Sequence, residues 1–411
     1  MEILPKTDVK FTSYQKFLIT VLSLLQFSIV LDFMIIAPLG DIMMKTLRVK
    51  PSQFSLIVSS YAFSAALSGI LTAGVADKFD RKKILIFFYS GFIIGTFLCG
   101  IAGSFWMLLV SRIMTGLFGG VIGSVSLAIV TDKFQSHRRG QAMSFIQMAF
   151  AASQVLGIPL GIILANNFGW HSTFFMIVVI ALIVYVALVL KLEQINEHLK
   201  IKFDKKPLLH IWHTVSNKKY QTGFLAIASL SVGGFMLMPF TSSFLVHNVG
   251  IKQQQLPIVF MLIGTFSLLV VPFIGKLSDK KDKFTIFACG SLIATLMILI
   301  YTHLSVVPIW KVTIIYILVI FGMMCRMISA QSLNTMIPES TSRGAYMSIS
   351  EAVKQIAGGI GTIVAGLVVK QTTNSSPLLH FDTLGYLIAG INLLSIAIVY
   401  RIKRRVKKDV K

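Results

Sequence analysis

Five ionisable side chains lie inside long apolar runs of this sequence, where a charge is costly unless it is paired or used. They are Asp32, Arg112, Arg326, Glu351 and Lys354. A buried carboxyl group can exchange a proton, and a nearby guanidinium can make that exchange depend on its own position. No His or Cys cluster has metal-site spacing and no glycine-rich phosphate loop is present, so we expect neither cofactor nor enzyme activity.

The apolar runs that hold these residues are long enough to cross a bilayer. The 411 residues are 55% hydrophobic and only 13% charged, which excludes a water-soluble globule. A helix needs roughly 20 apolar residues to span the hydrocarbon core, and twelve stretches qualify. Their limits are 17–39, 52–74, 84–102, 105–130, 140–165, 171–190, 221–246, 255–275, 284–303, 309–330, 343–369 and 383–400.

The distribution of Lys and Arg predicts the orientation of these spans. The chain carries a formal charge of +22, and most of its 38 cations fall in alternate loops and in the C-terminal tail. Loops rich in Lys and Arg stay in the cytoplasm, so we expect both termini there, with a bacterial inner membrane as the location. We expect a six-helix bundle over 1–190, a cytoplasmic linker over 191–220 and a second bundle with a basic tail over 221–411.

Two motifs occur once in each predicted bundle. The stretch from Ala73 to Arg81 after the second span is similar to the stretch from Gly275 to Lys283 after the eighth. Arg139-Gly140, opening the fifth span, recurs as Arg343-Gly344 at the eleventh. The sequence therefore predicts an all-α membrane protein made of two pseudo-symmetric six-helix bundles.

With these motifs the chain resembles the major facilitator superfamily of secondary transporters over essentially its whole length. The family loop after the second helix is matched by Ala76, Asp77, Arg81 and Lys82, and the Arg-to-Gly spacing of the fourth helix by Arg112 and Gly116. The resemblance implies two bundles around a central cavity that opens to either side in turn.

The fifth span carries the features of one branch of that family. Gly157, Pro159 and Gly161 lie in it, and Gly169-Trp170 with Phe174 follows. This resembles the twelve-helix sugar-efflux and drug-efflux proton antiporters. We expect Gly157, Pro159 and Gly161 to bend the helix or to allow close packing where the bundles meet.

Asp32 and Arg112 are predicted to face each other. At about 1.5 Å of rise per residue, Asp32 lies roughly 22 Å from the inner start of its helix and Arg112 roughly 10 Å from the outer start. Both therefore lie at one level, and the resemblance places their helices beside the cavity. Asp32 would carry the proton and Arg112 would tune it; the alternative is a static ion pair that holds two helices together.

Glu351, Lys354 and Arg326 are candidates for the cavity. Glu351 and Lys354 are one helical turn apart and share a face. They could contact substrate or carry a second proton; in the other interpretation they compensate each other and also satisfy Arg326.

Charged residues of the repeated loops are candidates for gating. Asp77 could accept hydrogen bonds at the start of the eleventh helix, which would latch the bundles while the cavity is open outward. The other interpretation is a set of solvated loop charges. The candidate set is Asp77, Arg81, Lys82, Asp279, Lys283, Arg139 and Arg343.

Together these features predict a secondary transporter that couples efflux of a small drug-like or sugar-like solute to proton entry. The alternatives are a proton-coupled symporter that imports a metabolite and, from another class, a polytopic membrane enzyme. We expect the partners to be a small-molecule substrate, protons and the lipid bilayer, with no nucleic acid, and the protein to be a monomer.

Overall fold

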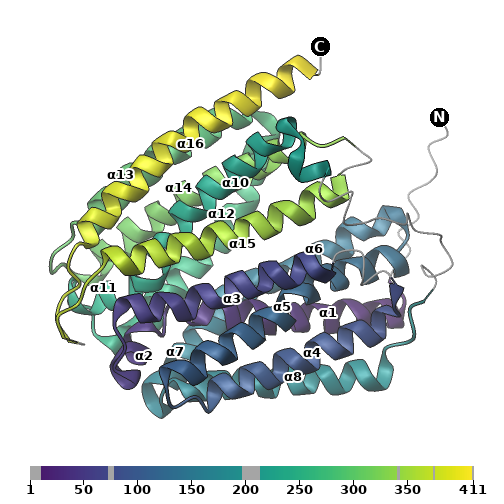
Figure 1. Cartoon of the computed structure of the whole chain (residues 1–411), viewed down its shortest axis with the longest axis horizontal. Helices are drawn as coiled ribbons and strands as arrows, with labels where there is room; N and C mark the ends of the chain where they lie inside the picture. Colours follow the sequence, from purple (N-terminus) through teal and green to yellow (C-terminus); the bar gives the residue numbers. More distant parts are fainter. Residues whose placement is uncertain (1–10, 73–77, 197–212, 340–342, 374, 410–411) are drawn as a thin grey trace.

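The computed structural model describes residues 11–72, 78–196, 213–339, 343–373 and 375–409. Figure 1 shows two groups of helices, one from each half of the chain. The N-terminal half contains α1 (Ser13–Ile35), α2 (Gly40–Leu47), α3 (Pro51–Thr72), α4 (Arg81–Gly100), α5 (Phe105–Lys133), α6 (Ser136–Ala152), α7 (Ile158–Phe168) and α8 (His171–Lys191). The C-terminal half contains α10 (Lys218–Leu237), α11 (Thr241–His247), α12 (Leu256–Lys280), α13 (Lys283–Thr302), α14 (Ile309–Asn334), α15 (Arg343–Val368) and α16 (Phe381–Asp409).

Twelve helical stretches of the described chain are long and apolar enough to cross a membrane, as predicted. An even number of crossings places the start of α1 and the end of α16 at one end of the molecule (Figure 1). We call this the inner end, because the charge pattern predicts that it faces the cytoplasm, and the opposite one the outer end. Within the described ranges β-structure is limited to one bridge, between Lys370 and Leu379.

Three spans depart from a continuous α-helix. The first ends at Ile35 rather than at the expected Leu39, and the chain turns into the short helix α2. The seventh is interrupted by a 3₁₀ turn at Met238–Phe240, because Pro239 cannot supply a backbone N–H. The fifth contains the π-helical segment Ser153–Gly157, which separates α6 from α7.

The two repeated loops end in the same kind of helix cap. Asp80 accepts a hydrogen bond of 2.7 Å from the backbone of Lys82 at the start of α4. Asp282 accepts one of 3.1 Å from the backbone of Thr285 at the start of α13. A carboxylate at this position satisfies a free N–H group of the first turn, so the similar motifs have similar local structures.

The buried apolar side chains show where the two halves are joined. The largest cluster lies at the outer end and in the middle, and it contains residues of both halves, including Leu39, Phe54, Phe240 and Phe244. At the inner end each half has its own cluster, with Leu18, Leu85 and Leu188 in one and Phe287, Tyr346 and Val399 in the other. The halves therefore share a core at the outer end and have separate cores at the inner end.

Small residues allow the closest approach between the halves. A Cβ on Gly366 of α15 would overlap the side chain of Ser55 of α3, and one on Gly264 of α12 would lie 2.9 Å from the Gln154 carbonyl oxygen. Ser55 and Gly366 lie toward the outer ends of their helices. Figure 1 shows α3 and α15 side by side there and farther apart toward the inner end.

Candidate functional site

An ion pair between α1 and α5 lies inside the N-terminal half. Arg112 Nη1 is 2.7 Å from Asp32 Oδ2, and at most 1% of either side chain is exposed. Thr96 of α4 donates a hydrogen bond of 3.4 Å to the other carboxylate oxygen. The predicted pairing of Asp32 with Arg112 is confirmed, and its role in proton transfer stays a prediction.

Glycines determine how closely α5 approaches its neighbours. A Cβ on Gly116, one turn after Arg112, would overlap the backbone of Tyr61 in α3, and one on Gly95 of α4 would overlap Thr115. Without these side chains α5 packs tightly against both helices. The Arg112 guanidinium therefore lies over the Tyr61 ring, 4.6 Å from its centroid, where the π-system stabilises a cation.

Asp32 supplies the described hydrogen bonds of the Arg112 guanidinium. Arg112 Nη1 also contacts the Asp32 carbonyl oxygen at 3.4 Å, and Arg112 Nε is buried without a hydrogen-bond partner among the described residues. A buried charge that loses its partner is strongly destabilised. Protonation of Asp32 would therefore favour movement of the guanidinium away from this position.

Glu351 and Lys354 form an ion pair on the surface of α15. Lys354 Nζ is 2.9 Å from Glu351 Oε2, and the side chains are 55% exposed for Glu351 and 42% for Lys354. They lie in the inner part of α15. Their predicted proximity is confirmed.

Arg326 of α14 is buried and its recorded partner is a hydroxyl group. Only 2% of the residue is exposed, and its Nη2 donates a hydrogen bond of 3.1 Å to Ser395 Oγ of α16. The alternative in which Glu351 and Lys354 also satisfy Arg326 is wrong, because α14 directs this side chain toward α16. In the part of the chain described, no acidic side chain forms an ion pair with it.

The first repeated loop forms its described contacts within the N-terminal half. Arg81 Nε is 3.3 Å from Asp132 Oδ2 at the end of α5. Lys82 Nζ donates to the carbonyl oxygens of Val189, at 3.2 Å, and of Leu192. These contacts hold the inner ends of α4, α5 and α8 together; Asp77 lies outside the described residues.

The corresponding contacts elsewhere are also local. Lys283 Nζ donates to the Ser278 carbonyl oxygen at 3.3 Å, and Arg139 Nε to the Phe134 carbonyl oxygen at 2.9 Å. The side chains of Asp279 and Arg343 lie outside the description. The proposed latch belongs to the conformation that is open outward, so separate cores at the inner end do not test it.

The glycines of the fifth span pack within their own half. A Cβ on Gly157 would overlap Leu31 of α1, and one on Gly161 would lie 2.8 Å from side-chain atoms of Ile35 and Thr173. The fifth span does pack closely where the halves meet, because both the π-helical segment and α7 contact α12. At Gln154 the room for this contact comes from Gly264 of α12, whereas Gly157 and Gly161 face their own half.

The predicted distortion of this span is present. The π-helical segment Ser153–Gly157 ends just before Pro159, which occupies the first turn of α7. Proline supplies no N–H to the helix, and π-helical turns are a common way to absorb such an interruption.

Within the described ranges, no group of three His, Cys, Asp or Glu side chains could hold a metal ion.

Comparison with known proteins identifies the family. The model of the Major Facilitator Superfamily matches residues 22–362. The chain belongs to the major facilitator superfamily. It is a membrane transporter rather than an enzyme, and the fold predicted from the sequence is confirmed.

Individual relatives of this transporter are distant. The Bacillus subtilis (strain 168) protein named "Uncharacterized MFS-type transporter YceJ" is 25% identical over 92% of this chain and 94% of its own length. A "Probable sugar efflux transporter" of Helicobacter acinonychis (strain Sheeba) is 23% identical over 67% of this chain and 69% of its own. The fold is similar to that of a bacterial homologue of the human lysosomal transporter Spinster in an inward-facing, unoccupied conformation, with a TM-score of 0.80, 16% identity and coverage of 97% and 99% of the two chains.

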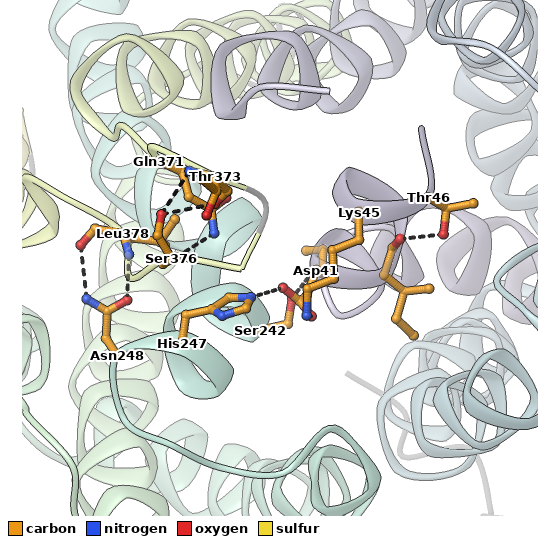
Figure 2. Close-up of polar contacts among 12 residues, drawn as sticks. Asp41, Lys45, Thr46, Ser242, His247, Asn248, Gln371, Thr373, Ser376 and Leu378 are labelled. Carbon is orange, nitrogen blue, oxygen red and sulfur yellow. Dashed lines mark hydrogen bonds and ion pairs between the residues drawn. The ribbon is translucent and has the colours of Figure 1, made fainter. Parts of the chain in front are cut away.

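One polar contact between the halves of this transporter was not predicted from the sequence. At the outer end, His247 Nε2 of α11 lies 2.6 Å from Asp41 Oδ1 of α2, and the two side chains point toward each other in Figure 2. Lys45 Nζ is 2.8 Å from the second Asp41 oxygen. These residues flank the apolar runs, so an inspection limited to charges inside the membrane does not include them. The spacing of Asp41 and Lys45 by one helical turn could have indicated their pairing from the sequence.

Proposed function

We propose that this transporter exports a small sugar-like or drug-like solute in exchange for protons, by alternating access to a site between its two halves. The observation that carries the proposal is the fully buried pair of Asp32 and Arg112. An intramembrane carboxylate with a movable counter-ion supplies a site where proton binding and conformation depend on each other. The relatives named as probable sugar efflux transporters support export.

The conformation described here suits the stage at which solute enters from the inner side. The halves share a core at the outer end and are separate at the inner end. In this stage Asp32 has released its proton inward and is paired with Arg112. After the halves rearrange, Asp32 takes a proton from the outer side, the pair separates, and the solute leaves.

Three charged residues of the C-terminal half are proposed to act on the solute. Glu351 and Lys354 contact it directly, because their side chains are accessible on α15. Arg326, buried between α14 and α16, contributes positive potential. In the opposite conformation Asp77, Arg81 and Lys82, with Asp279, Lys283, Arg139 and Arg343, would close the inner end. We infer a monomer in a bacterial inner membrane with both termini in the cytoplasm.

The test replaces Asp32 with its uncharged isostere. Purified protein in liposomes is given an imposed pH gradient, and movement of labelled sugars and toxic apolar compounds is followed together with proton flux. Asp32→Asn should abolish gradient-driven accumulation and solute-linked proton flux while solute exchange continues. Asp382→Asn, which changes an exposed carboxylate at the outer start of α16, is the matched control and should leave both unchanged.

Each outcome of this assay separates the candidate functions. Uphill transport by Asp32→Asn at the wild-type rate would remove Asp32 from coupling. Solute and protons that move in the same direction would show a symporter, and conversion of the solute without a gradient would show an enzyme.

A further inference from the structure

The outer end of the molecule holds a small polar network between its halves. Asp41 accepts hydrogen bonds from Lys45 within α2 and pairs with His247 of α11 across the interface. Close by, Ser242 Oγ of α11 donates a bond of 2.9 Å to the Ala37 carbonyl oxygen. Figure 2 shows the imidazole and the carboxylate meeting between the two helices.

Both partners are held in place from their own half. α2 begins at Gly40, where a Cβ would lie 3.0 Å from Phe54 and from the Pro239 carbonyl oxygen, so this turn can approach the C-terminal half closely. On the other side, Asn248 bonds the backbone of Leu378 twice, at 3.0 and 2.8 Å, which fixes the end of α11. The Asp41 carboxylate and the His247 imidazole are therefore already positioned to form their hydrogen bond whenever the outer end closes.

The pair is well shielded from water. The side chains of His247 and Asp41 are 7% and 3% exposed. Burial raises the pKa of Asp41, but the hydrogen bonds from His247 and Lys45 outweigh burial and hold it below its usual range. Asp41 thus stays ionised in the range, about pH 5 to 8, where histidine ordinarily gains its charge.

We propose that Asp41 and His247 form a proton-dependent latch at the outer end, which external acid strengthens by protonating His247. An imidazolium donates a charge-assisted hydrogen bond to the carboxylate, which is stronger than the bond from neutral imidazole. The latch exists only while the outer end is closed, so a proton bound there favours the closed conformation by linkage. The inference rests on alternating access in the proposed function, and it does not depend on proton coupling at Asp32.

The charged groups around the pair are consistent with a latch that protonation of His247 strengthens. The charged groups bonded to the site, Asp41 and Lys45, both come from α2. From the C-terminal half, Tyr301 and Phe381 pack on Phe244 of α11 and add no charge. Lys370 and His380, in the segment that carries Leu378, are exposed to solvent.

The test measures the distance between the halves at the outer end. Spin labels at Lys50→Cys and Gln254→Cys, both exposed positions, are placed in a Cys289→Ser background, because Cys289 is the exposed native cysteine among those described. Double electron–electron resonance on the full chain in lipid nanodiscs then gives the ratio of short to long distances. Acidification from about pH 8 to about pH 5.5 should raise this ratio about fivefold, the factor expected when a neutral hydrogen bond becomes charge-assisted.

Three variants separate the latch from general effects of acid. His247→Gln keeps a donor but cannot titrate, and Asp41→Asn removes the acceptor charge; each should reduce the pH response to less than about twofold. His303→Gln is the matched control, since His303 lies at the same end but its described side-chain hydrogen bonds, to Tyr386, Leu299 and Thr302, stay within its own half. It should keep the wild-type response.

The outcomes distinguish the latch from the proposed function. A wild-type ratio that responds to solute but not to pH, or a full pH response in both His247→Gln and Asp41→Asn, would overturn the latch and leave alternating access standing. A ratio that responds to nothing would overturn both. Loss of coupled transport in Asp32→Asn with an intact pH response would support the latch independently of Asp32.

Discussion

The two halves of the transporter treat their buried charges differently. The N-terminal half encloses a complete ion pair, Asp32 with Arg112, and surrounds it with Thr96 and the ring of Tyr61. The C-terminal half buries Arg326 against a serine and leaves its own acid–base pair, Glu351 with Lys354, exposed on the surface of α15. The two repeats thus build similar frames that differ in whether a buried charge has an ionic partner.

Removal of one partner of the buried ion pair in the N-terminal half should cause the largest loss of stability. Arg112→Gln leaves Asp32 buried without its counter-ion and should lower the free energy of unfolding by about 3 to 5 kcal/mol. The double variant Asp32→Asn/Arg112→Gln should recover most of that loss, because no charge remains unpaired. Unfolding by sodium dodecyl sulfate in mixed micelles measures both, and a double variant no more stable than Arg112→Gln would contradict the argument.

Replacement of the buried arginine of the C-terminal half should change the free energy of unfolding in the opposite direction. Arg326→Gln removes a buried cation that has no acidic partner among the described residues, and should raise the free energy of unfolding by about 1 kcal/mol. Arg326→Lys keeps the charge with fewer hydrogen-bond donors and serves as the control. Its free energy of unfolding should be lower than that of the wild type. A loss of stability in Arg326→Gln comparable to that in Arg112→Gln would show that the halves do not differ in this respect.

The smallest effect is expected at the loop of the second repeat. Lys403 Nζ, 2.8 Å from Asp282, and the cap bonds of Thr285 hold the pKa of Asp282 below its ordinary value despite some burial. A lowered folded-state pKa stabilises the protein above about pH 4, and that contribution is lost as the pH falls through it. Asp282→Asn should cost less than about 0.5 kcal/mol at neutral pH, because exposed pairs are weak. Lys403→Gln should reproduce most of the change, and a difference from wild type that grows on acidification would contradict this sign.

Much of the fold and part of the site could be predicted from the sequence. The bilayer fixes the length of each apolar run, so the twelve spans could be counted, and constant helical rise placed Asp32 and Arg112 at one level. Helical periodicity likewise brought Glu351 beside Lys354. These predictions succeed because they depend on geometry within single helices.

The errors concern contacts that packing decides. A glycine marks a close approach without naming the neighbouring helix: the fifth span meets α12 as expected, but Gly157 and Gly161 themselves face α1 and α8. One of the two interpretations of Glu351 and Lys354 had them satisfy Arg326 as well, whereas the rotation of α14 turns Arg326 toward Ser395. Asp41 and His247 are 206 positions apart, and only the folded outer end brings them together.

The apolar core that joins the halves at the outer end has a thermal consequence. Contacts across it, such as the one between Phe54 and Phe240, must be lost when the outer end opens. Association of such side chains weakens on cooling, since their hydration has a large heat capacity. We therefore expect a cold membrane to favour opening toward the exterior, so that temperature shifts the resting orientation of the carrier.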